Sequence, residues 1–351
     1  ASQCFRQDPH TVDINNFLPA GMRSRPSVAS LVSGIFDAEL ELNEKLPFWQ
    51  GHVLTSLPAQ LHRLGYRTEF WYGGGLGHGS LEHFLPAAGF DACHSGFDIC
   101  PADAPRTWLG IYDHVFLHWA AVLIQKQDID QPVFHFLYTT SNHGPYKMPY
   151  AELGFDTDRV MPEWSKQLKQ DKMTWRKLGA SWYADQSLMH FIAVMKSAFP
   201  DSLFVVTGDH STGVIPFNHG LVKRQEPSLR DDLLTSFAMH HPDLTPEMLA
   251  GNTIGGHMNI LPTLIELIAP KGFEYYSLFP SLTEKLDHVV TADCWMTEDR
   301  LGDYRNQTAQ SLRVSARELP LQRNVLQFES EHDAWRELSG WFVRHPELLR
   351  H

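Results

Sequence analysis

The sequence predicts an α/β fold with a mostly parallel central sheet flanked by helices and a small α+β addition at its C-terminal end. Strand-like apolar runs alternate with helical patterns, which is typical of sheets built from β-α-β units. A chain of 351 residues, 43% hydrophobic and 20% charged, can bury a sizeable core. The pattern becomes irregular beyond about residue 287, so we expect a main domain over 1–286 and a C-terminal extension over 287–351.

The first half of the chain carries two predicted helices and two predicted strands. RPSVASLVSGIF (25–36) begins after a proline and has apolar residues at helical spacing, which indicates a helix after a loop. SLPAQLHRLGYRTEFWYGG (56–74) indicates a helix, a break at Gly65 and a strand that ends in glycines. PVFHFLYTTSNHGPY (132–146) indicates a second strand that continues into a polar loop.

The second half repeats this alternation. KLGASWYADQSLMHFIAVMKSAF (177–199) has apolar residues at i, i+3, i+4 and i+7, as an amphipathic helix does, and leads into the strand FVVT (204–207). MNILPTLIELIAP (258–270) is expected to be a helix with a proline near each end. The 151–176 stretch indicates a surface excursion, and the last part combines strand-like HVVTAD (288–293) with a final helix.

Bulk composition excludes some classes of partner. A formal net charge of −12 without a run of Lys or Arg argues against nucleic acid, although a single phosphate or sulfate group remains compatible with it. No stretch reaches the roughly 18 consecutive apolar residues of a membrane span. Cys93 and Cys100 are expected either to form a disulfide or to be two free thiols. The chain begins with Ala rather than Met, so we expect it to be part of a longer protein.

Three predicted strands end in polar, glycine-containing loops. These are WYGGGLGHG (71–79), YTTSNHGPY (138–146) and VVTGDHSTG (205–213). The C-terminal ends of parallel strands lie at one edge of a sheet, where open α/β sheets bind their ligands. We therefore expect the three loops to share a crevice. The alternative for Asp209-His210 taken alone is an ordinary polar turn with a surface histidine.

Ser24 precedes a predicted helix and lies between two arginines. A serine hydroxyl becomes a useful nucleophile only when a metal or base lowers its pKa. Asp209 and His210 are suitable ligands for such a metal, and Arg23 can steady an anionic group beside the helix N-terminus. The alternative is that Ser24 is simply the helix N-cap, which the local sequence also fits.

Histidines in the predicted loops are further candidates. His78, His219 and His257 lie near the expected crevice, and each is either a substrate contact or an ordinary loop residue.

A series of short motifs follows one another in a fixed order over roughly residues 15–285. In chain order they are Gly21-Met22-Arg23-Ser24, Tyr72-Gly73-Gly74, Phe84, Gly89-Phe90, Ser141-Asn142-His143-Gly144-Pro145-Tyr146, Tyr183-Ala184-Asp185, Gly208-Asp209-His210 and Gly256-His257-Met258-Asn259. This ordered set resembles the sulfatase-type branch of the alkaline phosphatase superfamily. It is most similar to the lipoteichoic acid synthase-like phosphoglycerol transferases.

The resemblance implies a division of roles. Ser24 is the expected nucleophile and would bind a divalent cation together with Asp209 and His210, with Mn²⁺ or Mg²⁺ preferred and Ca²⁺ as an alternative. His143 would contact the phosphate or stabilise the leaving group. A covalent intermediate on Ser24 would pass to water or to an acceptor hydroxyl. The remaining expected substrate-binding residues are Arg23, Asn142, His78 and His257.

The chain also departs from the family pattern. The family's first strand, which ends in an acidic metal ligand, has no counterpart in the 23 residues before Ser24, where Asp8 and Asp13 are the only acidic residues. Asn259 stands where the pattern has Asp. Ser24-Arg25-Pro26-Ser27 resembles the sulfatase maturation motif, but Val28 replaces its Arg, so formylglycine is not expected.

The leading hypothesis is a metal-dependent phosphoglycerol transferase or phosphodiesterase. It would act on an anionic lipid headgroup or glycan ester at the extracytoplasmic face of a membrane, to which a region outside this sequence would anchor the parent protein. The second hypothesis is a sulfatase or phosphatase that releases a small anion to water. The third is a catalytically degenerate domain that only binds a glycan or headgroup.

Overall fold

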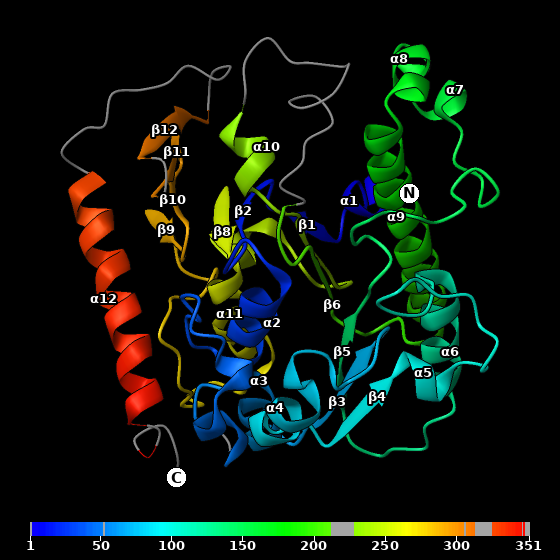
Figure 1. The fold of residues 1–351 in the computed structure, drawn as a ribbon. Coiled ribbons are helices and arrows are strands. Elements are labelled where there is room, and N and C mark those ends of the chain that lie inside the picture. The colour runs from blue at the N-terminus through cyan, green and yellow to red at the C-terminus, as the bar shows by residue number, and fades with distance from the viewer. Residues whose placement is uncertain are drawn as a thin grey trace.

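The computed structural model describes residues 2–51, 53–211, 228–304, 307–312, 325–345 and 347 (Figure 1). His219 lies outside the described residues.

One half of the central sheet is parallel, as predicted. β3 (Arg67–Tyr72) lies between β4 (Ala92–Ser95) and β5 (Val133–Tyr138), and all three strands run in the same direction. Their last residues, Tyr72, Ser95 and Tyr138, are in register. The loops that follow these strands therefore begin at one edge of the sheet.

The other half is mixed. β7 (Phe237–His240) lies between β1 (Thr11–Asp13) and β6 (Phe204–Thr207) and is antiparallel to both. Beside them, β2 (Asn16–Leu18) and β8 (Ile254–Gly256) form a parallel pair. The predicted strand 204–207 is confirmed, whereas the sequence analysis did not foresee the direction of β7.

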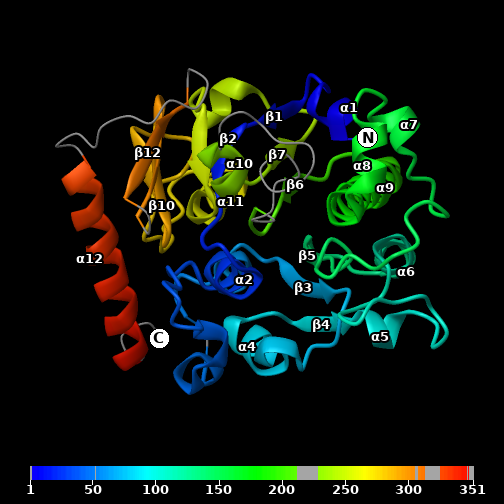
Figure 2. The same cartoon turned by 45° about the horizontal axis from the view of Figure 1, so that its top comes forward.

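The two halves face each other at β5 and β6, which lie side by side in both views (Figures 1 and 2). Phe136 and Val205 pack against one hydrophobic cluster, and Leu137 and Val206 pack against another on the opposite face. Nevertheless, no β-ladder joins the two strands in the described part of the chain. All their residues are only half-buried, while most of β3 and all of β7 are buried. Among the described residues, an apolar sheet thus has two unpaired edges in its middle.

Helices cover both faces of this arrangement (Figure 2). One face carries α6 (Asp113–Gln125) and the long α9 (Lys172–Ala198), which pack against each other. α9 begins before the predicted residue 177 because the Asp171 side chain caps it, accepting a hydrogen bond from the Thr174 amide at 3.1 Å. The other face carries helices that pack around the hydrophobic cluster that Phe136 and Val205 contact. These helices are α2 (Ser24–Ser33), α3 (Leu57–Arg63) and α11 (Ile260–Ile268).

Shorter helices complete the main part of the fold. They are α1 (Ser2–Arg6), α4 (Leu81–Ala88), α5 (Gly96–Ile99), α7 (Thr157–Val160), α8 (Ser165–Gln170) and α10 (Leu229–Leu233). There are also short 3₁₀ turns: η1 (Leu42–Glu44), η2 (Leu46–Trp49), η3 (His78–Ser80), η4 (Pro246–Leu249) and η5 (His257–Asn259). α7 and α8 belong to the predicted surface excursion and lie beside the N-terminal end of α9 (Figure 1).

The C-terminal part forms a second, antiparallel sheet. Its strands are β9 (His288–Val290), β10 (Cys294–Thr297), β11 (Arg300–Asp303) and β12 (Thr308–Ser311), each paired with the next. α12 (Val325–Arg344) lies against this sheet through an ion pair of 2.6 Å between His288 and Glu331. Met296 and Leu301 share a hydrophobic cluster with Phe17 of β2, so this part packs on the main body.

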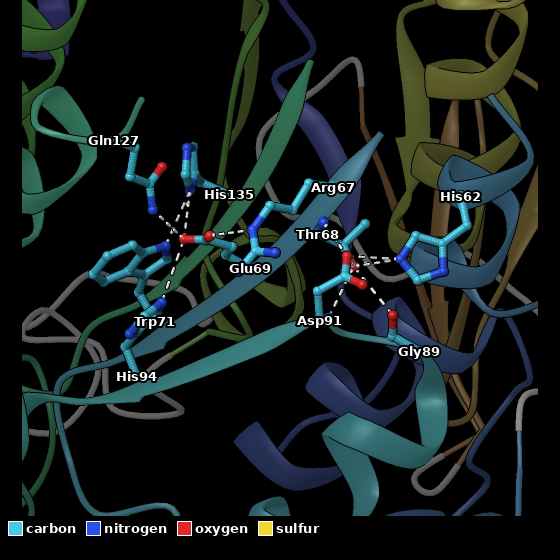
Figure 3. A network of polar contacts seen from close by, with 10 residues as sticks. All are labelled: His62, Arg67, Thr68, Glu69, Trp71, Gly89, Asp91, His94, Gln127 and His135. Atoms are coloured by element: carbon cyan, nitrogen blue, oxygen red, sulfur yellow. Dashed lines mark hydrogen bonds and ion pairs between the residues drawn. The ribbon is translucent and has the colours of Figure 1, made fainter. Parts of the chain in front are cut away.

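A buried carboxylate network fixes the parallel strands (Figure 3). Glu69 accepts hydrogen bonds from Arg67 Nε at 2.9 Å and from Gln127 Nε2 at 2.7 Å, and His94 Nε2 lies 3.3 Å away. Burial alone would raise the pKa of Glu69, but these partners outweigh burial and lower it to about 2. Asp91, just before β4, makes a similar set of contacts and accepts a hydrogen bond from the Thr68 amide at 2.8 Å.

Two expectations concern cysteines and membranes. Cys93 and Cys100 are free thiols, which decides between the two alternatives. Among the described residues, no helix combines the length and the apolar character needed to cross a membrane.

Candidate active site

Ser24 is the first residue of α2, and Arg23 in extended conformation occupies the cap position. The Ser24 side chain does not cap the helix. Its hydroxyl instead lies 3.2 Å from His210 Nε2. The loop before it is held by the Ser27 hydroxyl, which donates to the Gly21 carbonyl at 2.8 Å. The serine is therefore placed at a helix N-terminus with its hydroxyl turned toward the end of β6.

Asp209 and His210 follow β6 directly. Asp209 Oδ1 accepts the backbone N–H of His210 at 2.9 Å, and Asp209 Oδ2 lies 3.6 Å from His210 Nε2. His210 Nδ1 lies 2.5 Å from the Ser211 carbonyl, which can only accept. Nδ1 therefore carries the proton of the neutral ring. This leaves the lone pair of Nε2 directed at Ser24.

Tyr138, which the sequence analysis did not select, ends β5 next to these groups. Burial raises its pKa, the Asp209 carboxylate raises the pKa further, and a hydrogen bond with Ser24 acts in the opposite direction. Its ring stacks on Tyr72 of β3 with centroids 5.0 Å apart. The signal in the sequence was its place as the last aromatic residue of a strand, which becomes informative only once the neighbouring strands are known.

The loops after β3 and β5 each carry a histidine, His78 and His143. Burial lowers the pKa of His78, and the charges of Arg25 and His143 lower it further. His143 is exposed, and its ring lies edge-on to Trp108 at 5.3 Å. The neighbouring Asn142 is also exposed. The charge of His143 therefore acts on the histidine of the other loop.

Asp113 anchors the loop that carries His143. Its Oδ1 accepts the amides of Thr140 and Ser141 at 3.0 Å each, and its own amide donates to the Ser141 hydroxyl at 2.9 Å. Asp113 is buried, and burial raises its pKa. The sequence analysis missed this residue because nothing in its local pattern reveals the loop it contacts.

The two arginines beside Ser24 point to different neighbours. Arg23 is exposed and forms an ion pair of 3.6 Å with Glu39. Arg25 forms an ion pair of 2.8 Å with Glu44 and affects the pKa of both Tyr72 and His78. Arg25 is therefore a second cation near the crevice.

His257 is placed as a positioning residue. Its ring is 1% exposed, Nδ1 accepts the Ala20 amide at 3.1 Å, and Nε2 donates to the Gly208 carbonyl at 2.9 Å. Burial lowers its pKa to about 4, so the ring is neutral at physiological pH. With both nitrogens engaged it ties the loop before Ser24 to the loop of Asp209, which favours a positioning role over the substrate contact expected from the sequence.

Two further side chains hold this part of the site. Asp293, between β9 and β10, accepts the Met22 amide at 3.2 Å, so the C-terminal part also supports the Ser24 loop. Asn259 accepts the Gly256 amide and donates to the Pro280 carbonyl, both at 2.9 Å. An aspartate could not donate the second bond, which gives the departure from the motif a structural reason.

Asp8 and Asp13, the two acidic residues that precede Ser24, have other partners. Arg6 Nη1 contacts both carboxylate oxygens of Asp13 at 2.6 and 2.7 Å. Lys196 donates to Asp8 at 3.0 Å. Neither carboxylate contacts Ser24, Asp209 or His210 in the described structure.

The donor set at Ser24, Asp209 and His210 suits a divalent cation. The imidazole nitrogen His210 Nε2 lies 3.2 Å from Ser24 Oγ and 3.6 Å from Asp209 Oδ2. Ligand atoms bound at about 2 Å to one cation have similar separations from one another. In the described part of the chain, no three His, Cys, Asp or Glu side chains gather into a cluster of their own. The set is therefore compatible with a cation but supplies a single carboxylate.

Known proteins match both the sequence and the fold. The sequence model of the sulfatase family matches residues 10–269. The lipoteichoic acid synthase LtaP from Listeria monocytogenes superposes with a TM-score of 0.73 at 19% identity, over 95% of this chain and 84% of its own. The C-terminal periplasmic domain of EcEptC from Escherichia coli, in complex with Zn, gives 0.57 at 15% identity, over 86% and 84%. The Streptococcus pyogenes phosphoglycerol transferase GacH, in complex with sn-glycerol-1-phosphate, gives 0.53 at 11% identity, over 98% and 81%. At such identities the structures show a shared fold.

Proposed function

The chain belongs to the sulfatase family, as its motifs indicated, and within that family we propose that it is a metal-dependent phosphoglycerol transferase or phosphodiesterase. The observation that carries this proposal is the 3.2 Å contact between the Ser24 hydroxyl and His210 Nε2. This contact supports the proposal because it brings the proposed nucleophile close to Asp209 and His210, the proposed metal ligands, which lie far from Ser24 in the sequence.

The residues of the site suggest how an ester would be cleaved. Ser24 Oγ loses its proton to solvent and forms a bond to phosphorus, the bond from phosphorus to the leaving alcohol breaks, and His143 would protonate that alcohol. Arg23 and the N-terminus of α2 stabilise the anionic phosphoryl oxygens. Water or an acceptor hydroxyl then displaces Ser24 from phosphorus.

A divalent cation held by Ser24, Asp209 and His210 would polarise the ester and lower the pKa of the serine hydroxyl. His210 Nε2 serves this arrangement because its lone pair is already free of a proton. Mn²⁺ and Mg²⁺ are the preferred candidates. With its pKa lowered in this way, the Ser24 hydroxyl would lose its proton more readily during attack.

The open edges of β5 and β6 bear on the missing acidic ligand. We propose that a strand from outside residues 1–351 pairs with both edges and ends in a carboxylate beside Asp209. The support is the half-exposed apolar side chains on both strands and the proximity of their ends, Tyr138 and Asp209. Such a strand would be apolar on both faces.

We propose an anionic lipid headgroup or glycan ester as substrate, at the extracytoplasmic side of a membrane. The complex of GacH with sn-glycerol-1-phosphate supports the first part and the periplasmic domain of EcEptC the second. Among the alternatives, Val28 in place of the maturation-motif Arg disfavours a formylglycine sulfatase.

Turnover of model esters tests this function. With Mn²⁺ present, we expect a nitrophenyl phosphodiester to be cleaved faster than the phosphomonoester or the aryl sulfate. Ser24→Ala should lower turnover by at least about 10³-fold, as loss of a nucleophile does. Ser197→Ala, at an exposed position of α9, is the control. Unchanged turnover in Ser24→Ala, or a preference for the aryl sulfate, would contradict the proposal.

A further inference from the structure

A cavity of about 560 Å³ lies beside His143, between the loop of Trp108 and the loop that follows β5. Its size is within the range of roughly 300–1,000 Å³ for small-molecule sites. The residues that matter here are Arg106, Trp108, Tyr146, Lys147 and Tyr150.

The Tyr150 hydroxyl is the least expected feature of this cavity. Tyr150 is 0% exposed and lines the cavity, yet its hydroxyl has no hydrogen-bond partner in the described structure. Burial raises its pKa to about 12, so the hydroxyl keeps its proton. An unpaired buried polar group costs about 1–3 kcal/mol. Such a hydroxyl at a cavity wall can be satisfied by a hydroxyl of a bound ligand.

Trp108 offers a fixed apolar platform at the mouth. It is 63% exposed, although its Nε1 donates to the Gly144 carbonyl at 2.7 Å and its ring is edge-on to His143. An indole that is exposed to this degree and held in this way can lie against an apolar ring surface. Tyr146, on the loop that follows β5, has a φ of +56°, a backbone conformation that a bulky residue rarely adopts.

Two cations border the cavity. Arg106 and Lys147 are exposed and form no ion pair within the described part of the chain; the recorded contact of the Arg106 guanidinium is with the Phe97 ring at 5.9 Å. In a protein with a formal charge of −12, two unpaired cations at one cavity favour an anionic ligand.

We propose that this cavity binds an anionic sugar unit of the substrate or acceptor. The sugar ring would lie on Trp108, one of its hydroxyls would pair with Tyr150, and its negative group would lie near Arg106 and Lys147. An acyl chain would leave the Tyr150 hydroxyl and both cations without partners. This inference rests on the proposed function, because the cavity is also lined by His143, which that function assigns to the reaction.

Binding of glucose 6-phosphate to metal-free protein, followed by calorimetry, tests the inference separately from catalysis. Inorganic phosphate and glucose are the two reference probes, and we expect both to bind at least about tenfold more weakly than glucose 6-phosphate. Tyr150→Phe should lower the affinity about tenfold, the equivalent of one hydrogen bond, without lowering the melting temperature. Trp108→Ala should lower it similarly. Trp164→Ala, at an exposed indole outside the cavity, is the matched control.

The outcomes separate the two proposals. Loss of turnover in Asp209→Ala with sugar binding retained supports both. Sugar binding without ester turnover in the unaltered protein would overturn the proposed reaction but not the subsite. The subsite is overturned if inorganic phosphate binds as tightly as glucose 6-phosphate, or if Tyr150→Phe and Trp108→Ala leave the affinity unchanged.

Discussion

The Ser24 hydroxyl lies 3.2 Å from His210 Nε2, although 186 residues separate them in the sequence. The helix N-terminus of α2 supplies the first group and the C-terminal end of β6 the second. His257 links the two loops from behind by hydrogen bonds to Ala20 and Gly208. Hydrogen bonds from the buried His257 to both loops therefore help to hold Ser24 and His210 close to each other.

His257 should make stability depend on pH. Its pKa is about 4 in the folded protein and about 6.5 in the unfolded chain, so the unfolded chain binds an extra proton between these values. The contribution of the neutral ring is therefore complete above about pH 6.5 and is lost as the pH falls toward 4. His257→Gln should reduce the difference in the free energy of unfolding between pH 7 and pH 5 by about 2 kcal/mol. Urea denaturation at both pH values measures this, and exposed His118→Gln should keep the original difference.

Asp113 should act on catalysis through the His143 loop. Asp113→Ala removes both hydrogen bonds to the Thr140 and Ser141 amides, so we expect turnover to fall about tenfold or more. Mn²⁺ affinity should change by less than about twofold, because no metal-binding side chain contacts Asp113. Steady-state kinetics and a Mn²⁺ titration check this, with Asp103→Ala in the preceding loop as control. An equal loss of metal affinity would refute the positioning role.

Glu69 should stabilise the parallel strands rather than the reaction (Figure 3). Glu69→Gln replaces a charged acceptor that faces Arg67 and Gln127, so the free energy of unfolding should fall by about 2 kcal/mol. Glu82→Gln, at a carboxylate that is 56% exposed, should change it by less than about 0.5 kcal/mol. Chemical denaturation compares the two variants, and equal effects would contradict the role of the network.

The open edges of β5 and β6 predict a pattern of hydrogen exchange. The backbone carbonyls of Pro132 and Tyr138 accept hydrogen bonds from amides on the β3 side. Because the backbone groups of successive residues in a strand point to opposite sides, the amides of Val133, His135 and Leu137 face β6. These amides should exchange faster than those of Phe134 and Phe136. In a longer protein that carries the proposed strand, the difference should disappear. Uniform protection in residues 1–351 would mean that the edges are already paired.

The sequence predicted the parts of the site that lie in short motifs. Ser24, Asp209 and His210 could be selected because each follows a recognisable pattern at a strand or helix end. Asp113 and Tyr138 could not, because their importance depends on which strands and loops are neighbours.

The fold likewise has features that the sequence predicted and features that it did not. The predicted helices and strands are present, because their hydrophobic periodicity is local. The antiparallel direction of β7 and the unpaired edges of β5 and β6 are properties of strand pairing, which periodicity does not encode. His257 illustrates the limit at a single residue: its sequence position near the crevice was correct, but its burial was not visible.

The central claim is that Ser24, Asp209 and His210 bind one cation. Anomalous diffraction from crystals soaked in Mn²⁺ tests it most directly. The account predicts a single strong peak within about 2.5 Å of Ser24 Oγ, an Asp209 carboxylate oxygen and His210 Nε2. A Mn²⁺ peak bound elsewhere, with none between these three side chains, would contradict it.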